Sequence, residues 1–160
     1  MTIDRVIIQT ENFMISTINP PHISREDGGH IVIVCKKNSI NEYEDMSDSL
    51  ALELSVLARI AGKGLKKALA KDNIDVGIIN YQINGNWSIC SEIKDPLHLH
   101  VYGRAKCSDK QRYGEALYLP KPLTGFYKNN KGLSNVDISL IRDYFLCKIE
   151  RRKEINIIDD

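Results

Sequence analysis

The chain has 160 residues, of which 42% are hydrophobic, 27% charged and 7% aromatic, so it is long enough for one domain with a substantial core. Twenty-two basic against twenty-one acidic side chains leave a formal charge of +1, which argues against nucleic acid or an acidic membrane as a partner. No apolar run reaches the roughly 18 to 20 residues of a membrane span, and the start, MTIDRVIIQTENF, does not read as a signal peptide. We therefore expect a soluble, cytoplasmic protein with a single domain over residues 1–160, in which any anionic ligand is held by a local site.

The four cysteines are too sparse and too evenly spread for a disulfide framework. They are Cys35, Cys90, Cys107 and Cys147, and no two of them stand at the spacing of a zinc knuckle. We therefore interpret all four as reduced thiols.

The first third of the chain has the alternation that is typical of β-strands. Its apolar runs lie at residues 6–8, 13–15 and 31–35. Between the last two runs, the segment NPPHISREDGGH carries two prolines and a pair of glycines, which favour a turn-rich loop and a hairpin-like pair of strands.

Residues 47–70 have the periodicity of a helix. Apolar residues recur every three or four positions, at Leu50, Leu54, Leu57, Ala61, Gly64 or Leu65, and Ala68. Ser47 or Asp48 can cap the amino end, and lysines crowd the carboxyl end, where the helix dipole favours positive charge. We expect the apolar stripe of this helix to lie on the sheet.

The second half of the chain contains two more β-like runs, residues 76–81 and 97–102, and then a turn-rich segment, residues 105–132, that is expected to wrap the core. A second helix follows Ser134 and Asp137, which resemble a capping box. Because the strands come in runs rather than alternating strictly with helices, the order predicts an α+β domain. Its sheet is mainly antiparallel and packs against a central helix, with an irregular extension and a C-terminal helix.

The sequence PLHLHVYGRA places two histidines on one face of a predicted strand. Residues two apart share a face, so one face carries Pro96, His98, His100 and Tyr102, and the other carries Leu97, Leu99 and Val101. Two such imidazoles can bind a metal together, or one can attack an electrophile while its neighbour donates a hydrogen bond. Zinc is the minority interpretation because no second paired ligand motif accompanies them. A bare pair of histidines is more often two surface or core residues.

Together with GGHIVIVCKK earlier in the chain, this strand resembles the histidine triad family of nucleotide hydrolases and transferases. That family has a His-x-His-x-His strand, an earlier Gly-His-hydrophobic strand and a connecting helix. Residues 29–37 resemble the early strand, residues 47–70 the helix, and His98 and His100 lie in the triad strand. The resemblance covers about residues 12–104, which implies a core there and an extension over residues 105–160. It also implies a homodimer that pairs through the helix and a neighbouring strand.

Only two of the three histidines of such a triad are present, so their register has to be chosen. The family follows its third histidine with two hydrophobic residues, a Pro or Gly and a basic residue. Counting back from Gly103 and Arg104 makes His100 the third histidine, His98 the middle one and Pro96 the replacement for the first. The other register, with His100 in the middle, would bring this turn two residues early.

In this register the resemblance implies that His98 is the nucleophile and attacks the α-phosphorus of a nucleotide, giving a covalent nucleotidyl-histidine that water hydrolyses. His100 would donate a hydrogen bond to a phosphate oxygen or to the leaving group. The implied substrate is a nucleotide or dinucleotide, with dinucleoside polyphosphate hydrolysis as the leading interpretation. No cofactor is expected to be required, and a loosely held divalent ion could accompany the phosphates.

The family also places an amide side chain upstream of the triad, near the phosphate. Gln82, Asn84 and Asn86 stand in the corresponding window, and each is equally well explained as a turn residue. Trp87 is interpreted as a cover for the base or as a packing residue.

The early strands are expected to supply the nucleoside pocket. Val32 and Ile15 are the candidate apolar walls and Asn19 is the candidate ribose contact, while the core interpretation is at least as strong for each. His22 and His30 are interpreted as structural residues.

Two alternatives to an enzyme remain at this stage. The missing first histidine favours a nucleotide-binding module with little turnover, and the pair itself favours a metal-binding protein built on His98 and His100.

Overall fold

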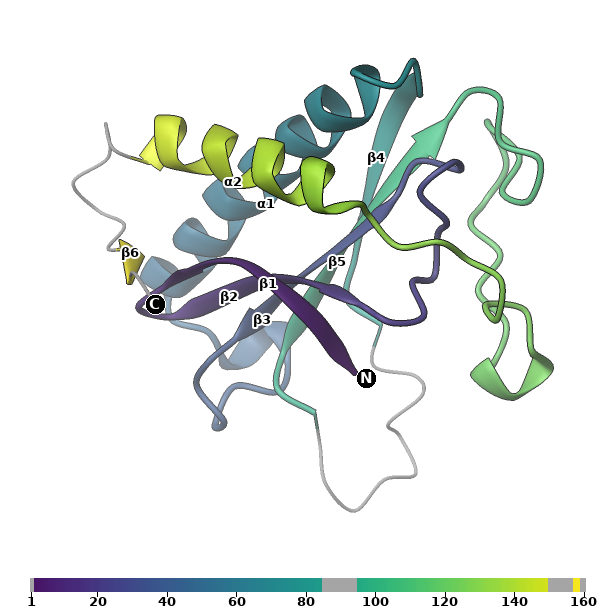
Figure 1. The fold of residues 1–160 in the computed structure, drawn as a ribbon. Helices are drawn as coiled ribbons and strands as arrows, with labels where there is room; N and C mark the ends of the chain where they lie inside the picture. The colour runs from purple at the N-terminus through teal and green to yellow at the C-terminus, as the bar shows by residue number, and fades with distance from the viewer. Residues whose placement is uncertain (1, 85–94, 150–156, 159–160) are drawn as a thin grey trace.

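The structure is a computed structural model that describes residues 2–84, 95–149 and 157–158 (Figure 1). The elements follow in the order β1 (Ile3–Thr10), β2 (Phe13–Ile18), β3 (His30–Cys35), α1 (Asp48–Ala70), β4 (Val76–Gln82), β5 (His98–Ala105), α2 (Asn135–Ile149) and β6 (Ile157–Ile158). Two single 3₁₀ turns, Tyr43–Asp45 and Pro122–Thr124, lie in the connections.

The strands form one antiparallel sheet in the order β4-β5-β3-β2-β1-β6. Helix α1 packs over β3, β4 and β5, and α2 packs over β1 and against α1, so both helices lie on the same face of the sheet (Figure 1). The predicted α+β class, with an antiparallel sheet, a central helix and a C-terminal helix, is confirmed.

Helix α1 forms where its apolar stripe predicts. The Ser47 hydroxyl caps its first turn by accepting from the Leu50 amide, and the predicted stripe residues are all buried. This stripe contacts the helix-facing side chains of the sheet, among them Ile31, Ile33 and Val101, which are fully buried. The hydrophobic effect of burying these side chains holds the helix on the sheet.

The opposite face of the sheet has a different character. A small apolar cluster of Ile18, Val32 and Val34 lies there, with Ile3 and Met14 packed at its edge. Next to it stand the side chains of β5 that alternate with Leu99 and Val101, because successive residues of a strand point to opposite faces. The histidines therefore lie on the face away from the helices.

The loop between β2 and β3 is pressed against β5 at two glycines. Gly28 has a φ of +124°, and a Cβ at Gly103 would stand 1.9 Å from the Gly28 carbonyl oxygen. The Gly103 amide donates to the Gly29 carbonyl, and the Ala105 amide donates to the Asp27 carbonyl. This close backbone approach places His22 and His30 beside β5.

The segment after β5 is ordered by polar contacts with the rest of the fold. The Arg104 guanidinium, only 3% exposed, donates to the carbonyls of Arg112 and Glu115 and so ties this segment to the end of β5. Farther along, the Asn130 amide donates to the carbonyls of Pro21 and His22. These hydrogen bonds from the segment after β5 thus help to hold the loop that carries His22 in place.

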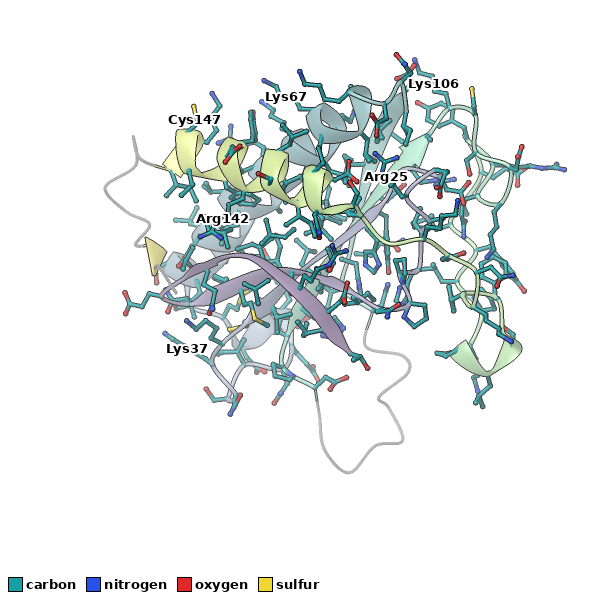
Figure 2. All side chains as sticks on the ribbon, viewed as in Figure 1. Arg25, Lys37, Lys67, Lys106, Arg142 and Cys147 are labelled. Atoms are coloured by element: carbon teal, nitrogen blue, oxygen red, sulfur yellow. The ribbon has the colours of Figure 1, made fainter. Side chains whose placement is uncertain are left out.

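Helix α2 begins with the predicted capping box. The Ser134 hydroxyl accepts from the Asp137 amide, and the Asp137 carboxylate accepts from the Ser134 amide. Arg25 adds a two-pronged contact to the same carboxylate, at 2.6 and 2.9 Å, and lies beside the start of the helix (Figure 2).

Cys35, Cys107 and Cys147 are free thiols, as expected, and Cys90 lies outside the described residues. Within the described part of the chain, neither helix combines the length and apolar character that crossing a bilayer needs.

Candidate functional site

The pairing of β5 with its neighbours defines the site. His98 lies opposite Val34, His100 lies between Val32 and Gln82, and Tyr102 lies opposite His30. Directly opposite residues of antiparallel strands point to the same face. The predicted alternation along β5 is therefore correct, and it brings Val32 and Gln82 next to His100.

All four histidines of the chain gather on this face. The ring centres of His22 and His30 are 4.8 Å apart, and each lies 5.1 Å from the ring centre of His100. His98 meets His100 edge-on, with ring centres 4.9 Å apart. The loop and β3 thus supply two imidazoles that the sequence-based interpretation separated from the site.

The main chain fixes the proton of His98. Its Nδ1 lies 2.9 Å from the carbonyl oxygen of Pro96, and because a carbonyl only accepts, Nδ1–H must be the donor. In the neutral ring this leaves the lone pair on Nε2. His98 is half-buried. Because Nδ1 carries the proton, Nε2 is the ring nitrogen that can act as a nucleophile.

A directional chain of hydrogen bonds fixes the proton of His100 in the opposite way. The His22 backbone N–H donates to His30 Nδ1 over 3.1 Å, so a neutral His30 carries its proton on Nε2. His30 Nε2–H then donates to His100 Nδ1 over 2.9 Å. A neutral His100 therefore carries its own proton on Nε2 and presents a donor.

The three clustered imidazoles stay neutral because of their burial. Desolvation, helped by the neighbouring His98, lowers the pKa of His22 to about 4 and that of His100 to about 2. Burial also lowers the pKa of His30 well below its ordinary value, with His100 and His22 adding to the effect. Near neutral pH the hydrogen-bonded chain is therefore made of uncharged rings.

His22, His30 and His100 are also close enough to be considered as metal ligands, since their ligand nitrogens lie within 4.8 Å of one another. However, both ring nitrogens of His30 already take part in hydrogen bonds, one of them directly to His100. An ion that used His30 would have to replace one of these bonds. His98, which the metal interpretation of the sequence required, is not in this group.

The other predicted contacts fall into three groups. Val32 is fully buried on the histidine face, and Gln82 lies opposite His100 with its Oε1 buried and without a partner among the described residues. Asn84 donates from Nδ2 to the Tyr102 hydroxyl over 3.0 Å. Asn19 is exposed at the end of β2.

Two candidates, Asn86 and Trp87, lie outside the described residues. One expectation is wrong: Ile15 lies in the core on the helix side of the sheet, so it cannot form a wall of the same pocket as Val32. The strand alternation of β2 explains this, because Ser16, not Ile15, lies opposite Val32.

Sequence reasoning missed the contact of His22 and His30 with His100. For His30 a signal was available, since it opens the strand that resembles the family's early strand, and that strand pairs directly with β5. His22 lies in an irregular loop, where spacing says nothing about direction.

Several solved structures have a fold similar to that of this chain. A hypothetical histidine triad nucleotide-binding protein from Sulfolobus tokodaii matches with a TM-score of 0.56 and 15% identity, over 93% of this chain and 87% of that one. A histidine triad protein from Bradyrhizobium japonicum matches with a TM-score of 0.56 and 17% identity, over 88% and 89% of the two chains. The chain has the histidine triad fold.

A zinc-bound histidine triad family protein from Mycobacterium smegmatis shares this fold, with a TM-score of 0.54 and 15% identity, over 92% of this chain and 88% of that chain. No protein-family model matches the sequence, and no curated protein matches it significantly. At these identities the likeness establishes the histidine triad fold alone.

Proposed function

We propose that the protein is a nucleotide hydrolase that cleaves a phosphoanhydride or phosphoramidate bond at the α-phosphate of a nucleoside, with a dinucleoside polyphosphate as the leading substrate. One observation carries this proposal. Two adjacent imidazoles are held in opposite tautomers, so that Nε2 of His98 has a lone pair while Nε2 of His100 has a proton. A nucleophile beside a hydrogen-bond donor is what displacement at a phosphorus needs.

The reaction would proceed in two displacements. In the first, His98 Nε2 forms a bond to the α-phosphorus, and the bond from phosphorus to the bridging oxygen or nitrogen breaks, with the electron pair going to the leaving group. In the second, water attacks the same phosphorus and loses a proton to solvent, the bond to His98 breaks with its electron pair returning to Nε2, and nucleoside monophosphate is released. His100 Nε2–H donates to a phosphate oxygen or to the leaving atom and opposes the growing negative charge.

The surroundings support this assignment. The apolar cluster of Ile18, Val32 and Val34 lies on the same face as the histidines and makes the surroundings of the site apolar. Gln82 offers an amide beside His100. Asn19, Asn86 and Trp87 stay predicted nucleotide contacts.

The decisive experiment measures release of nucleoside monophosphate from a dinucleoside polyphosphate and from a nucleoside phosphoramidate. We expect His98→Ala to lose about three orders of magnitude or more in rate, because it removes the nucleophile. We expect His100→Ala to lose about 100-fold to 1,000-fold, because it removes one charge-stabilising donor. Tyr144→Phe, in helix α2 on the opposite face of the sheet from the histidines, serves as the matched control and should keep full activity.

Trapping identifies the nucleophile directly. Acid-free mass spectrometry of protein mixed with substrate should find the nucleotidyl group on His98 in the wild type and no adduct in His98→Ala. Release of nucleoside monophosphate that His98→Ala leaves intact would refute the mechanism. Binding of both substrates without any release would instead support a nucleotide-binding module.

We also propose that the chain forms a homodimer through β4 and α1. Strand β4 is the outer strand of the sheet on the side of β5, and it exposes Ile78 and Tyr81 at 52% and 45%. An edge strand with apolar side chains favours pairing with another copy. Light scattering after gel filtration should give twice the chain mass for the wild type, and Ile78→Lys should shift the protein to a monomer. A monomeric wild type would refute this proposal.

A further inference from the structure

Tyr102 links the histidine cluster to Asn84, which follows β4. Its ring lies parallel to that of His100, with an interplanar angle of 6° and ring centres 5.2 Å apart. Its hydroxyl lies 2.7 Å from His22 Nδ1 and accepts from Asn84 Nδ2 over 3.0 Å. The side chain is fully buried, so these contacts account for the polar end of an otherwise apolar ring.

The direction of the Tyr102 hydroxyl bond follows from its chemistry. Burial raises the pKa of the hydroxyl well above its usual value, so the group keeps its proton. Because the buried hydroxyl accepts from Asn84, its one proton is left for the other polar atom within reach, His22 Nδ1, which accepts it. In the neutral His22 ring the proton then lies on Nε2.

The hydrogen bonds therefore run in one direction, from Asn84 through Tyr102 to His22, then from the His22 backbone to His30 and on to His100. His22 occupies the central position because its ring receives the tyrosine bond while its backbone N–H sets the tautomer of His30. Its place is fixed from outside by Asn130, which donates to its carbonyl, and by the Tyr127 ring at 5.2 Å.

We propose that Tyr102 and His22 are positioning residues that hold His100 as an Nε2–H donor. They act through His30 and through ring stacking, without touching substrate. Their effect on turnover rests on the function proposed above, whereas their effect on the protons of the rings does not. Loss of the tyrosine hydroxyl would leave His22 Nδ1 without its donor and would loosen the backbone N–H that fixes His30.

The first test reads the tautomers. Long-range ¹H–¹⁵N spectra of the full chain near neutral pH should show His22, His30 and His100 protonated on Nε2 and His98 on Nδ1. Tyr102→Phe keeps the stacked ring and removes only the hydroxyl, so we expect His22, His30 and His100 to become mixtures of tautomers. Unchanged tautomers in Tyr102→Phe would overturn the proposal, because they would leave Tyr102 with a packing role alone.

The second test reads catalysis. Tyr102→Phe should lower kcat about fivefold to tenfold with little change in KM, because the lost bond orients a donor and does not bind substrate. His22→Asn offers an amide oxygen near the position of Nδ1 and should keep more of kcat than His22→Ala. Equal kcat in the wild type and Tyr102→Phe would refute the catalytic part.

The matched control is Tyr144→Phe, which removes a hydroxyl from α2, on the other face of the sheet and outside this chain of bonds. A wild type that releases no nucleoside monophosphate would refute the proposed function, and the ring tautomers would then decide the role of Tyr102 and His22 by themselves.

Discussion

The buried imidazole of His100 should make the fold sensitive to acid. The side chain is 2% exposed, and desolvation together with the nearby His98 and His22 lowers its pKa from 6.5 to about 2. Below about pH 6.5 the unfolded chain binds a proton at this residue and the folded chain does not. The stabilising contribution is therefore complete above that pH and is lost progressively as the pH falls.

The size of this effect follows from the shift. Each pH unit below 6.5 costs about 1.4 kcal/mol while the folded ring stays neutral, so His100 alone removes about 2 kcal/mol from the free energy of unfolding between pH 7 and pH 5. That is a large fraction of a typical stability of about 5–15 kcal/mol.

The assay is urea unfolding of the wild type and of His100→Gln over this pH range, followed by circular dichroism. His100→Gln should be less stable near pH 7, but its unfolding free energy should fall by about 2 kcal/mol less on acidification. Ile33→Val, which removes a core methylene group and no titrating group, should keep the wild-type pH dependence. Parallel pH profiles for the wild type and His100→Gln would refute the buried neutral imidazole.

Three further predictions concern single contacts. Gly103→Ala would place a Cβ 1.9 Å from the Gly28 carbonyl oxygen and push the loop between β2 and β3 away from β5. Thermal unfolding should therefore show a free energy of unfolding that is lower by about 1–3 kcal/mol. An unchanged melting temperature would contradict the close approach. Ser134→Ala should cost about 1 kcal/mol in urea unfolding by removing the cap that accepts from the Asp137 amide, and an unaltered midpoint would contradict it. Gln82→Leu removes a buried oxygen that has no partner among the described residues, so stability should not fall while KM for the nucleotide rises; a lower stability with unchanged KM would mean that Gln82 is a structural residue.

The regular elements were predictable because they depend on local patterns. The helical stripe of residues 47–70 and the alternation around His98 and His100 each follow from one periodicity, and both are confirmed. The same rule shows why Ile15 was misplaced: the face of a strand depends on its register with its neighbour, and the pairing of Ser16 with Val32 is a long-range fact.

The cluster around His100 was only half predictable for the same reason. His30 belongs to a strand whose partner can be inferred, but His22 comes from a loop whose path is set by the glycine contact between Gly28 and Gly103 and by Asn130. Neither contact leaves a local signal in the sequence. The contact of a loop histidine such as His22 with the site therefore becomes evident only from the three-dimensional path of the backbone.

The proline at position 96 weakens the catalytic interpretation less than its side chain suggests. What fixes the reactive tautomer of His98 is the main-chain carbonyl of that residue, 2.9 Å from Nδ1, and a proline has the same carbonyl as a histidine. The tautomer of His100 is fixed by a main-chain donor instead, the backbone N–H of His22, which acts through the ring of His30. One proton is thus set directly by a main-chain acceptor, and the other by a main-chain donor acting through the ring of His30. Because the Pro96 carbonyl does not depend on residue type and the path to His100 does not pass through residue 96, a proline there leaves the proposed nucleophile and its neighbouring donor in place.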